Sequence, residues 1–132
     1  MPIAVLSTLP PETERLLTRI IGCGLEVHKR LGPGFLEGIY MRALCHELEC
    51  AELPFERERA IVVAYRDISI PGQRVDLIVG GAVVVEVKAV ARLEPVHEAQ
   101  VLSYLRTTRL RAGLLMNFNA ALFKHGLKRM VL

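Results

Sequence analysis

The sequence predicts an α/β fold, an α+β sandwich in which a mixed central sheet is flanked by helices. The N-terminal third places apolar residues at helical spacing, whereas the middle third is rich in β-branched residues that favour strands. A further helical segment and more apolar strands follow. The composition, 52% hydrophobic but only 5% aromatic, indicates an aliphatic core of Leu, Val, Ile and Ala.

The length of 132 residues predicts one domain, residues 1–132, with enough core to fold without disulfides. No apolar run approaches the ~20 residues that cross a bilayer, and no basic segment precedes an apolar one at the N-terminus. We therefore expect no membrane partner and a cytoplasmic location. Three cysteines without CxxC spacing argue against a disulfide framework and against a four-thiolate metal site.

Charge is distributed unevenly along the chain, although the formal net charge is only +3. Residues 92–132 carry seven basic and two acidic side chains, whereas residues 1–91 carry ten basic and twelve acidic ones. A basic tail suits a polyanionic partner such as nucleic acid. A solvated basic face explains the same distribution equally well.

Two helices are predicted first, after a loose N-terminus at residues 1–9. Proline and early acidic residues start the first helix at about residue 11, and glycine and proline at 32–34 end it after about Arg30. The expected buried positions are Leu16, Ile20, Cys23, Gly24, Val27 and Leu31. The second helix runs from about Phe35 or Leu36 to Ala51, with Tyr40, Met41, Leu44, Leu48 and Ala51 on its buried side.

Each of these helices carries a glutamate near its apolar face. Glu37 lies one turn before Tyr40 and is expected to belong to the inward-facing stripe. Glu26 lies on the flank of the apolar face of the first helix and competes for the same role. Either residue is also compatible with an ordinary surface or N-terminal helix glutamate.

Three strands follow in the middle of the chain. Residues 56–65 form the first, and residues 68–79 form the second, with a bulge expected at residues 71–72 because they are Pro and Gly. The third strand, residues 83–88, begins after a glycine-rich turn and places Glu86 and Lys88 two residues apart. With Asp76 on the second strand, this hairpin carries three charges in an aliphatic setting, which costs free energy unless they are paired or bind a metal.

The length of the turn decides whether these charges can cooperate. A strict two-residue turn at Gly80 and Gly81 would leave Asp76 and Glu86 on opposite sides of the sheet. A three-residue turn that includes Ala82 puts Asp76 opposite Glu86, and we predict this register. The other side should be apolar and covered by helices, so that the sheet is buried on both sides. Its residues are Val75, Leu77, Val79, Val83, Val85 and Val87.

The remaining elements are a helix over residues 95–106, a strand over residues 112–118 and a final edge strand over residues 122–132. Gln100 and Tyr104 share a face of the helix because they are four residues apart. In the final strand, the basic residues Lys124, Lys128 and Arg129 are expected at solvated positions.

The hairpin charges suit phosphodiester hydrolysis. A phosphodiester repels hydroxide, so its hydrolysis needs a metal to neutralise the phosphate and a cation for the charge that develops. Asp76 and Glu86 supply the hard oxygen ligands that Mg²⁺ prefers, and Lys88 points to the same side as Glu86. The alternative is an ordinary Glu-Lys pair at the end of a strand.

The order of elements, with Asp on one strand and Glu-x-Lys on the next, resembles the restriction-endonuclease-like core of the PD-(D/E)XK nuclease superfamily. In particular, residues 34–40 are similar to the signature of the GxxExxY family, with Gly34, Glu37 and Tyr40 at its fixed positions. Gln100 and Tyr104 resemble the Q-x-x-x-Y element of the RecB-like branch. The resemblance extends over most of the chain, through residues 74–76, 85–90, 100–105 and 113–118.

The resemblance implies a nuclease that hydrolyses DNA or RNA with Mg²⁺ (or Mn²⁺). It implies that Asp76, Glu86, the Val87 carbonyl and a helix glutamate, Glu37 or Glu26, bind the metal, with Lys88 as the catalytic lysine. Gln100 and Tyr104 would reach into the site and toward nucleic acid.

From the basic tail, we expect Arg106 and Arg109 to contact nucleic acid as well. A homodimer is a further hypothesis, because small cores of this kind often dimerise to span a substrate. The alternatives are a catalytically silent nucleic-acid-binding module and a protein-interaction module that uses the C-terminal edge strand.

Overall fold

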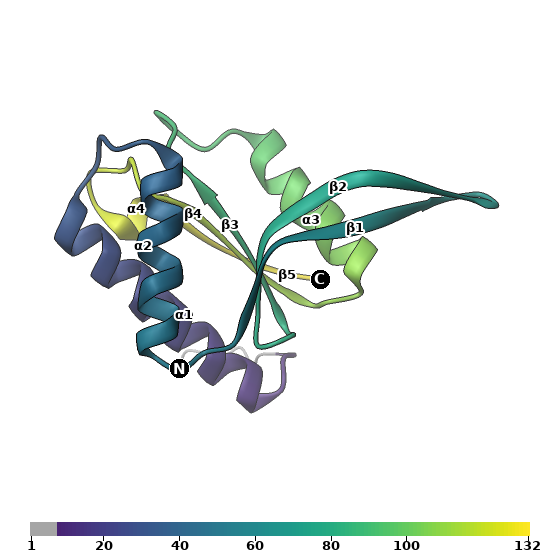
Figure 1. The fold of residues 1–132 in the computed structure, drawn as a ribbon, viewed down its shortest axis with the longest axis horizontal. Helices are drawn as coiled ribbons and strands as arrows, with labels where there is room; N and C mark the ends of the chain where they lie inside the picture. The colour runs from purple at the N-terminus through teal and green to yellow at the C-terminus, as the bar shows by residue number, and fades with distance from the viewer. Residues whose placement is uncertain (1–7) are drawn as a thin grey trace, which may run out of the picture.

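The computed structural model describes residues 8–132, so most of the predicted loose N-terminus lies outside the described residues. The elements are α1 (Pro11–Leu31), α2 (Glu37–Cys50), β1 (Phe55–Tyr65), β2 (Ile68–Val79), β3 (Val83–Lys88), α3 (Pro95–Thr108), β4 (Ala112–Asn117), α4 (Phe123–Gly126) and β5 (Leu127–Val131). The strands form one sheet in the order β1-β2-β3-β4-β5 (Figure 1). Only the pair β3 and β4 is parallel, with α3 as the connection between them. The predicted α+β architecture is confirmed.

Helices cover both faces of the central sheet, as predicted. One core lies between the sheet and α1 with α2, and a second, smaller core lies between the sheet and α3 (Figure 1). β3 is buried on both sides, because its alternate residues enter different cores. The three cysteines are free thiols, and no helix within residues 8–132 is long and apolar enough to span a membrane.

The β2–β3 turn has the predicted three residues. Val79 pairs with Val83, and both Gly80 and Gly81 adopt left-handed backbone conformations with φ of 60° and 65°. Glycine is favoured there because a Cβ destabilises this region of conformational space. At Gly80 the space is also limited, since a Cβ would lie 2.9 Å from the Leu16 side chain. The turn therefore fixes the register on which the placement of Asp76 depends.

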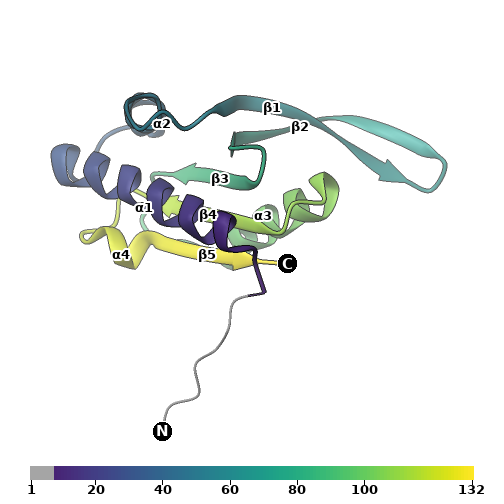
Figure 2. The same cartoon turned by 90° about the horizontal axis from the view of Figure 1, so that it is seen from below.

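The β1–β2 ribbon leaves the sheet and twists. β2 pairs with β3 only over residues 77–79, and its N-terminal part continues away from the body, paired only with β1 (Figure 2). The expected bulge at residues 71–72 is present, because partners shift from Ile61–Gln73 to Val63–Ile70. The prediction for Val75 is wrong in one respect: it packs in the α3 core, whereas Leu77 packs in the α1–α2 core. The twist of the ribbon turns one side from the first core toward the second.

The C-terminal segment departs from the predicted strand over residues 122–132. Residues 123–126 form the short helix α4, and the strand β5 begins only at Leu127. Phe123 is buried, with its ring 5.5 Å from that of Phe118 and 5.8 Å from that of His28, measured between centroids. Docking of this aromatic ring under α1 provides the burial that an edge strand would not. Lys124, Lys128 and Arg129 are exposed, as predicted.

Gly126 permits α4 to lie against the end of β4. A Cβ on Gly126 would lie 2.2 Å from the main-chain oxygen of Asn117, which cannot move without disturbing the strand. We expect Gly126→Ala to lower the free energy of unfolding by about 3 kcal/mol, measured by urea denaturation. Gly38→Ala is the matched control, because no atom lies within 4 Å of a Cβ at this helical position. Equal stability of the two variants would contradict the expectation.

Candidate active site

Asp76 and Glu86 face each other where β2 and β3 part. The last paired residues before the fork are Leu77 and Val85, so the next positions are occupied by the two carboxylates. The Asp76 main-chain N–H donates to Glu86 Oε1 at 2.9 Å, and the Val87 N–H donates to Asp76 Oδ2 at 2.9 Å. The side chains thus replace main-chain carbonyls as acceptors, and one oxygen of each carboxylate is left for another partner.

Burial of this pair makes its charge costly. The Glu86 side chain is only 3% exposed, and burial together with the neighbouring Asp76 raises its pKa to about 8. Burial also raises the pKa of Asp76, although the hydrogen bond from Val87 and the charge of Lys88 oppose this shift. Two carboxylates that share a site resist simultaneous ionisation in the absence of a cation. The pair is therefore prepared for a proton or a positive ion.

Lys88 supplies positive charge beside the pair. Its Nζ lies 3.9 Å from Glu86 Oε2, and 18% of its side chain is exposed, so the ammonium group borders both the carboxylates and solvent. Its main chain is fixed by the adjacent strand, because Phe118 N–H donates to the Lys88 carbonyl at 2.9 Å. The predicted placement of Glu86 and Lys88 on one side of β3 agrees with this contact.

Asn117 supports the segment after Lys88, a role that the sequence did not suggest. The side chain of Asn117 is buried and holds Val90 from both sides, accepting from its N–H and donating to its carbonyl, each at 3.0 Å. The register places Asn117 beside Lys88. The sequence indicated only a turn at Asn117, because its distant partners are brought together by the parallel pairing of β3 and β4.

The segment before α2 presents Glu37 toward the carboxylates. Tyr40 is fully buried and stacks on Phe118 at 5.0 Å between ring centroids, and its hydroxyl donates to the Gly32 carbonyl at 2.6 Å. The Phe35 N–H donates to the same hydroxyl at 3.1 Å. Tyr40 thereby fixes the loop from which α2 begins at Glu37.

Glu37 and Glu26, the two competing helix glutamates, have different surroundings. Glu37 is exposed at the first position of α2, which corrects its expected burial. It nevertheless lies close enough to Asp76 and Lys88 to feel both charges: burial first, and then Asp76, raise the pKa of Glu37, while Lys88 opposes them. Glu26 instead pairs with Arg30 at 2.6 Å on the surface of α1. The structure thus brings Glu37, and not Glu26, toward the pair.

Tyr104 and Gln100 extend the polar surroundings from the α3 side. The Tyr104 hydroxyl accepts a hydrogen bond from Gln73 Nε2 at 2.7 Å and also interacts with the side chain of Gln100. Burial and the charge of Glu86 raise the pKa of Tyr104. Gln73 was not predicted, because its orientation depends on the twist of β2. A polar side chain in the second half of a strand that re-enters the core was the available signal.

Glu58 is a second residue that the sequence left unnoticed. It lies between Arg57, the partner of Leu77, and Arg59, the partner of Val75, and therefore beside Asp76. Its φ of 51° is unusual for a non-glycine residue and marks the place where the ribbon changes direction. Its charge raises the pKa of Asp76 further. Three strands thus contribute carboxylates to the neighbourhood of the fork.

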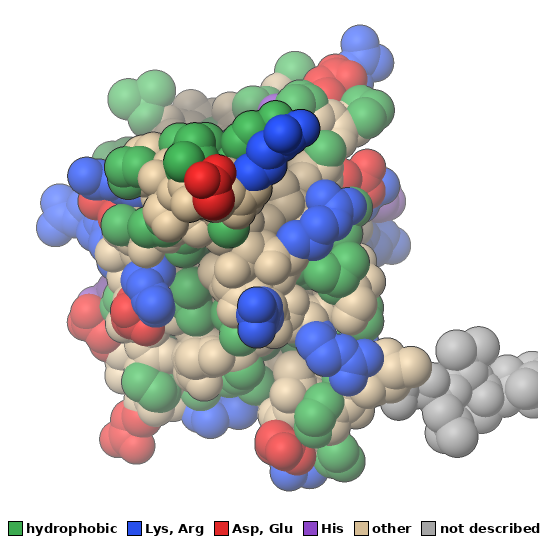
Figure 3. Space-filling model, turned by 90° about the vertical axis from the view of Figure 1, so that its right-hand side faces the viewer, with side chains coloured by type: hydrophobic (Ala, Val, Ile, Leu, Met, Phe, Trp, Pro, Cys, Tyr) green, Lys and Arg blue, Asp and Glu red, His purple; other side chains and the backbone are tan. Residues whose placement is uncertain are grey.

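Arg106 and Arg109 lie at the C-terminal end of α3. Both are exposed, and within residues 8–132 neither guanidinium has an ion-pair partner. With residues 62–64 of β1 and Thr107, they line a shallow hollow of about 280 Å³. Figure 3 shows several basic side chains on the side of the molecule from which the ribbon projects.

Other basic residues of the C-terminal tail are paired. Lys128 pairs with Glu98 at 3.1 Å, and Arg129 with Glu14. The tail thus presents less free positive charge than its composition indicates.

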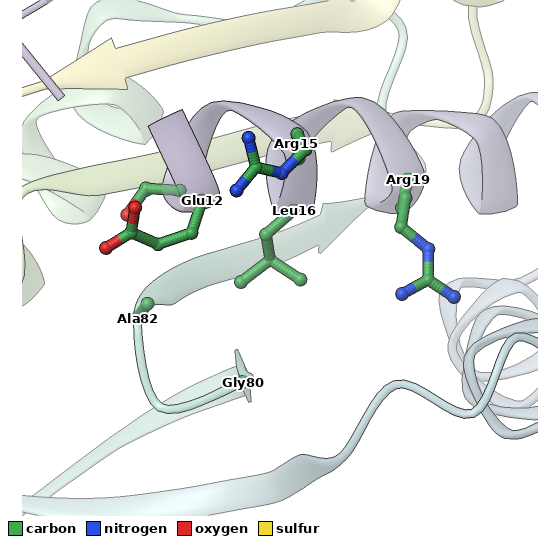
Figure 4. A pocket seen from close by; sticks show the side chains of 7 residues that line it. Glu12, Arg15, Leu16, Arg19, Gly80 and Ala82 are labelled. Atoms are coloured by element: carbon green, nitrogen blue, oxygen red, sulfur yellow. The ribbon is translucent and has the colours of Figure 1, made fainter. Parts of the chain in front are cut away.

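The largest hollow lies elsewhere and is mainly apolar in its floor. It measures about 500 Å³ and is bordered by Leu16, Arg19, Gly80 and Ala82 at the β2–β3 turn (Figure 4). Glu86 and Lys88 lie toward the other end of β3, so this hollow is separate from the carboxylate pair. Figure 4 shows Leu16 pointing from α1 toward the turn, in agreement with a packing role for this region.

The donor set of the fork fits a divalent cation in its chemistry. Within residues 8–132, no three acidic, histidine or cysteine side chains are already gathered closely enough to hold a metal ion. Asp76 and Glu86 each keep one carboxylate oxygen that accepts no main-chain hydrogen bond, and hard oxygen donors of this kind suit Mg²⁺. The raised pKa values show the need for positive charge that such an ion would meet.

Comparison with known proteins assigns the chain to a family. A family model described as the PD-(D/E)XK nuclease superfamily matches residues 14–130. Neither the curated proteins nor the solved structures contain a match to the chain. The matched region includes the fork, Lys88, Glu37 and the whole of α3. The chain belongs to the PD-(D/E)XK nuclease superfamily.

Proposed function

We propose that this protein is a metal-dependent nuclease that hydrolyses phosphodiester bonds of DNA or RNA, and that within the superfamily it belongs to the GxxExxY family of the RecB-like branch. One observation carries the proposal: the buried Asp76–Glu86 pair lies at a fork in the sheet with the Lys88 ammonium beside it. A purely structural ion pair would not require a second buried carboxylate, because that carboxylate adds repulsion and desolvation cost.

Asp76 and Glu86 would hold a divalent cation, Mg²⁺ or Mn²⁺, with the Val87 carbonyl and Glu37 as further ligands. When bound, this cation supplies neutralisation of the phosphate charge and activation of water. Glu37 suits the fourth position because it is exposed at the start of a helix and can adjust its rotamer toward the pair. Its raised pKa reflects the same local excess of negative charge.

Lys88 acts on the reacting groups. Its ammonium group lies between the buried Glu86 and solvent, where it orients the attacking water or stabilises the negative charge that develops on the phosphate. Gln100 and Tyr104 border the site from α3 and position the nucleic-acid backbone near it. Further along the same helix, Arg106 and Arg109 offer unpaired guanidinium groups to phosphates, a contact that weakens with salt.

The test is cleavage of labelled DNA and RNA, single- and double-stranded, with Mg²⁺, with Mn²⁺ and with EDTA. We expect metal-dependent cleavage of at least one substrate, and a loss of at least about 100-fold in rate for Lys88→Ala purified in the same way. Lys124→Ala is the control, because this lysine is exposed on α4. Equal cleavage by wild type and Lys88→Ala would indicate a contaminant. Salt-dependent binding without any cleavage would identify a catalytically silent module.

The two helix glutamates give a separate prediction. We expect Glu37→Gln to lower the cleavage rate about 10- to 100-fold and to weaken metal binding, because it removes a charge near Asp76. Glu26→Gln should leave both unchanged, since it breaks only the surface pair with Arg30. Titration with Mn²⁺, followed by the rate of cleavage, measures the apparent affinity. The reverse order of effects would assign the role to Glu26.

A further inference from the structure

The outer part of the β1–β2 hairpin, residues 62–72, projects from the body of the protein; we call it the arm. It consists of the end of β1, the turn at Arg66 and Asp67 and the start of β2. Figures 1 and 2 show it extending beyond the helices that cover the rest of the sheet. An isolated two-stranded ribbon of this kind is at best marginally stable in water unless something packs on it.

One side of the arm is entirely apolar. Val63 pairs with Ile70 and Tyr65 pairs with Ile68, so the four side chains lie together on one side. Their exposed fractions are 38% for Val63, 44% for Ile70, 57% for Tyr65 and 53% for Ile68. Alternation along β1 places them on the same side as Ile61, which is buried beneath α3. The arm therefore continues a core-facing surface past the point where α3 ends.

The edges of the arm are also open. β1 is the first strand of the sheet, and β2 has no partner on its other edge before residue 77. Residues 60–65 contain no charged side chain, and neither do residues 68–73; the only charges of the arm are Arg66 and Asp67 at the turn. Exposed edges of this length usually carry charges or other protection against pairing. Here the protection is absent, which indicates that another polypeptide covers the arm.

Charge selects the kind of partner. A nucleic acid would require cations along the contact, and the apolar side of the arm has none. A second copy of this chain meets the requirement, because an apolar side is complementary to itself across a two-fold axis and the arm's opposite charges cancel. An arm bare on one side and along both edges offers on the order of 800 Å² per copy, the area that a stable interface buries.

We propose that two copies of the protein associate through their arms, with Val63, Tyr65, Ile68 and Ile70 of each copy covered by the other. The proposal does not depend on nuclease activity, since it follows from the packing of the arm alone. It also assigns a function to a ribbon that lies away from the Asp76–Glu86 pair.

Light scattering coupled to gel filtration tests the association. We expect wild type to have twice the chain mass of 14.7 kDa at micromolar concentration. Ile68→Lys should raise the apparent dissociation constant at least about 30-fold, because it places a charge in the contact. Ser69→Lys is the matched control: Ser69 pairs with Ala64 on the opposite side of the same arm. Circular dichroism verifies that both variants fold.

Cross-linking provides a second measurement that does not depend on disrupting the interface. In a Cys50→Ser background, which removes the exposed native thiol, Ile68→Cys should form a disulfide-linked dimer on mild oxidation, whereas Ser69→Cys should not. A monomeric wild type, or a dimer that tolerates Ile68→Lys, would overturn the proposal. So would equal disruption by Ser69→Lys. If Ile68→Lys weakens binding of labelled DNA or RNA without changing the mass, the arm contacts nucleic acid and the proposal is also overturned.

Discussion

Asp76→Asn is expected to reduce phosphodiester cleavage at least about 1000-fold while the protein remains folded. The amide oxygen of asparagine can still accept the hydrogen bond from the Val87 N–H, so the fork keeps its geometry. What disappears is one negative charge at the place where a cation would bind. The measurement is the single-turnover rate on the best substrate at saturating Mg²⁺ or Mn²⁺.

The matched control is Asp67→Asn, the same substitution at the exposed turn of the arm. It should leave the rate of cleavage unchanged. Because loss of folding would also abolish activity, the thermal midpoint of Asp76→Asn must equal or exceed that of wild type. A variant that is folded and retains most of its activity would remove Asp76 from the catalytic site and, with it, the proposed mechanism.

Glu86→Gln is expected to stabilise the metal-free protein at alkaline pH. The folded-state pKa of Glu86 is raised to about 8 from an ordinary value of 4.5. The native state therefore holds a proton that the unfolded state releases, and wild-type stability falls as pH rises from about 4.5 to about 8. Glutamine carries no such charge, so the variant should exceed wild type by on the order of 2 kcal/mol at pH 9 and approach it near pH 5.

Urea denaturation at pH 5, 7 and 9 measures this difference. Glu26→Gln is the control, because Glu26 is paired with Arg30 at the surface and should give the same difference from wild type at every pH. Adding Mg²⁺ or Mn²⁺ should raise the thermal midpoint of wild type at pH 8 but not that of Glu86→Gln. Wild-type stability that stays constant or increases between pH 5 and 9 would contradict the burial argument.

The register of the β2–β3 hairpin could be predicted because local constraints agreed with one another. Two adjacent glycines determined the turn, and only a three-residue turn brought Asp76 opposite Glu86. The strand and helix order followed from periodicity in the same way. Local sequence was sufficient wherever short-range geometry and the apolar pattern favoured the same arrangement.

Features that depend on distant contacts could not be predicted. The turn of Val75 into the α3 core follows from the left-handed backbone of Glu58 on the neighbouring strand. Residues 123–126 become helical because Phe123 packs beside His28 and Phe118. An alternating pattern of apolar residues carries no information about such partners. The same reason explains why Gln73 and Asn117 were not recognised as supports of the site.

The fork at Asp76 and Glu86 joins the integrity of the sheet to the chemistry of the site. Two carboxylates act there as the acceptors that main-chain carbonyls would otherwise supply, so the β2–β3 ladder ends in side chains. Substitutions that extend the ladder with apolar pairs would make a more regular and more stable sheet but would remove both anions. Selection for stability alone would therefore close the fork, and its persistence in this chain measures what the two carboxylates contribute beyond folding.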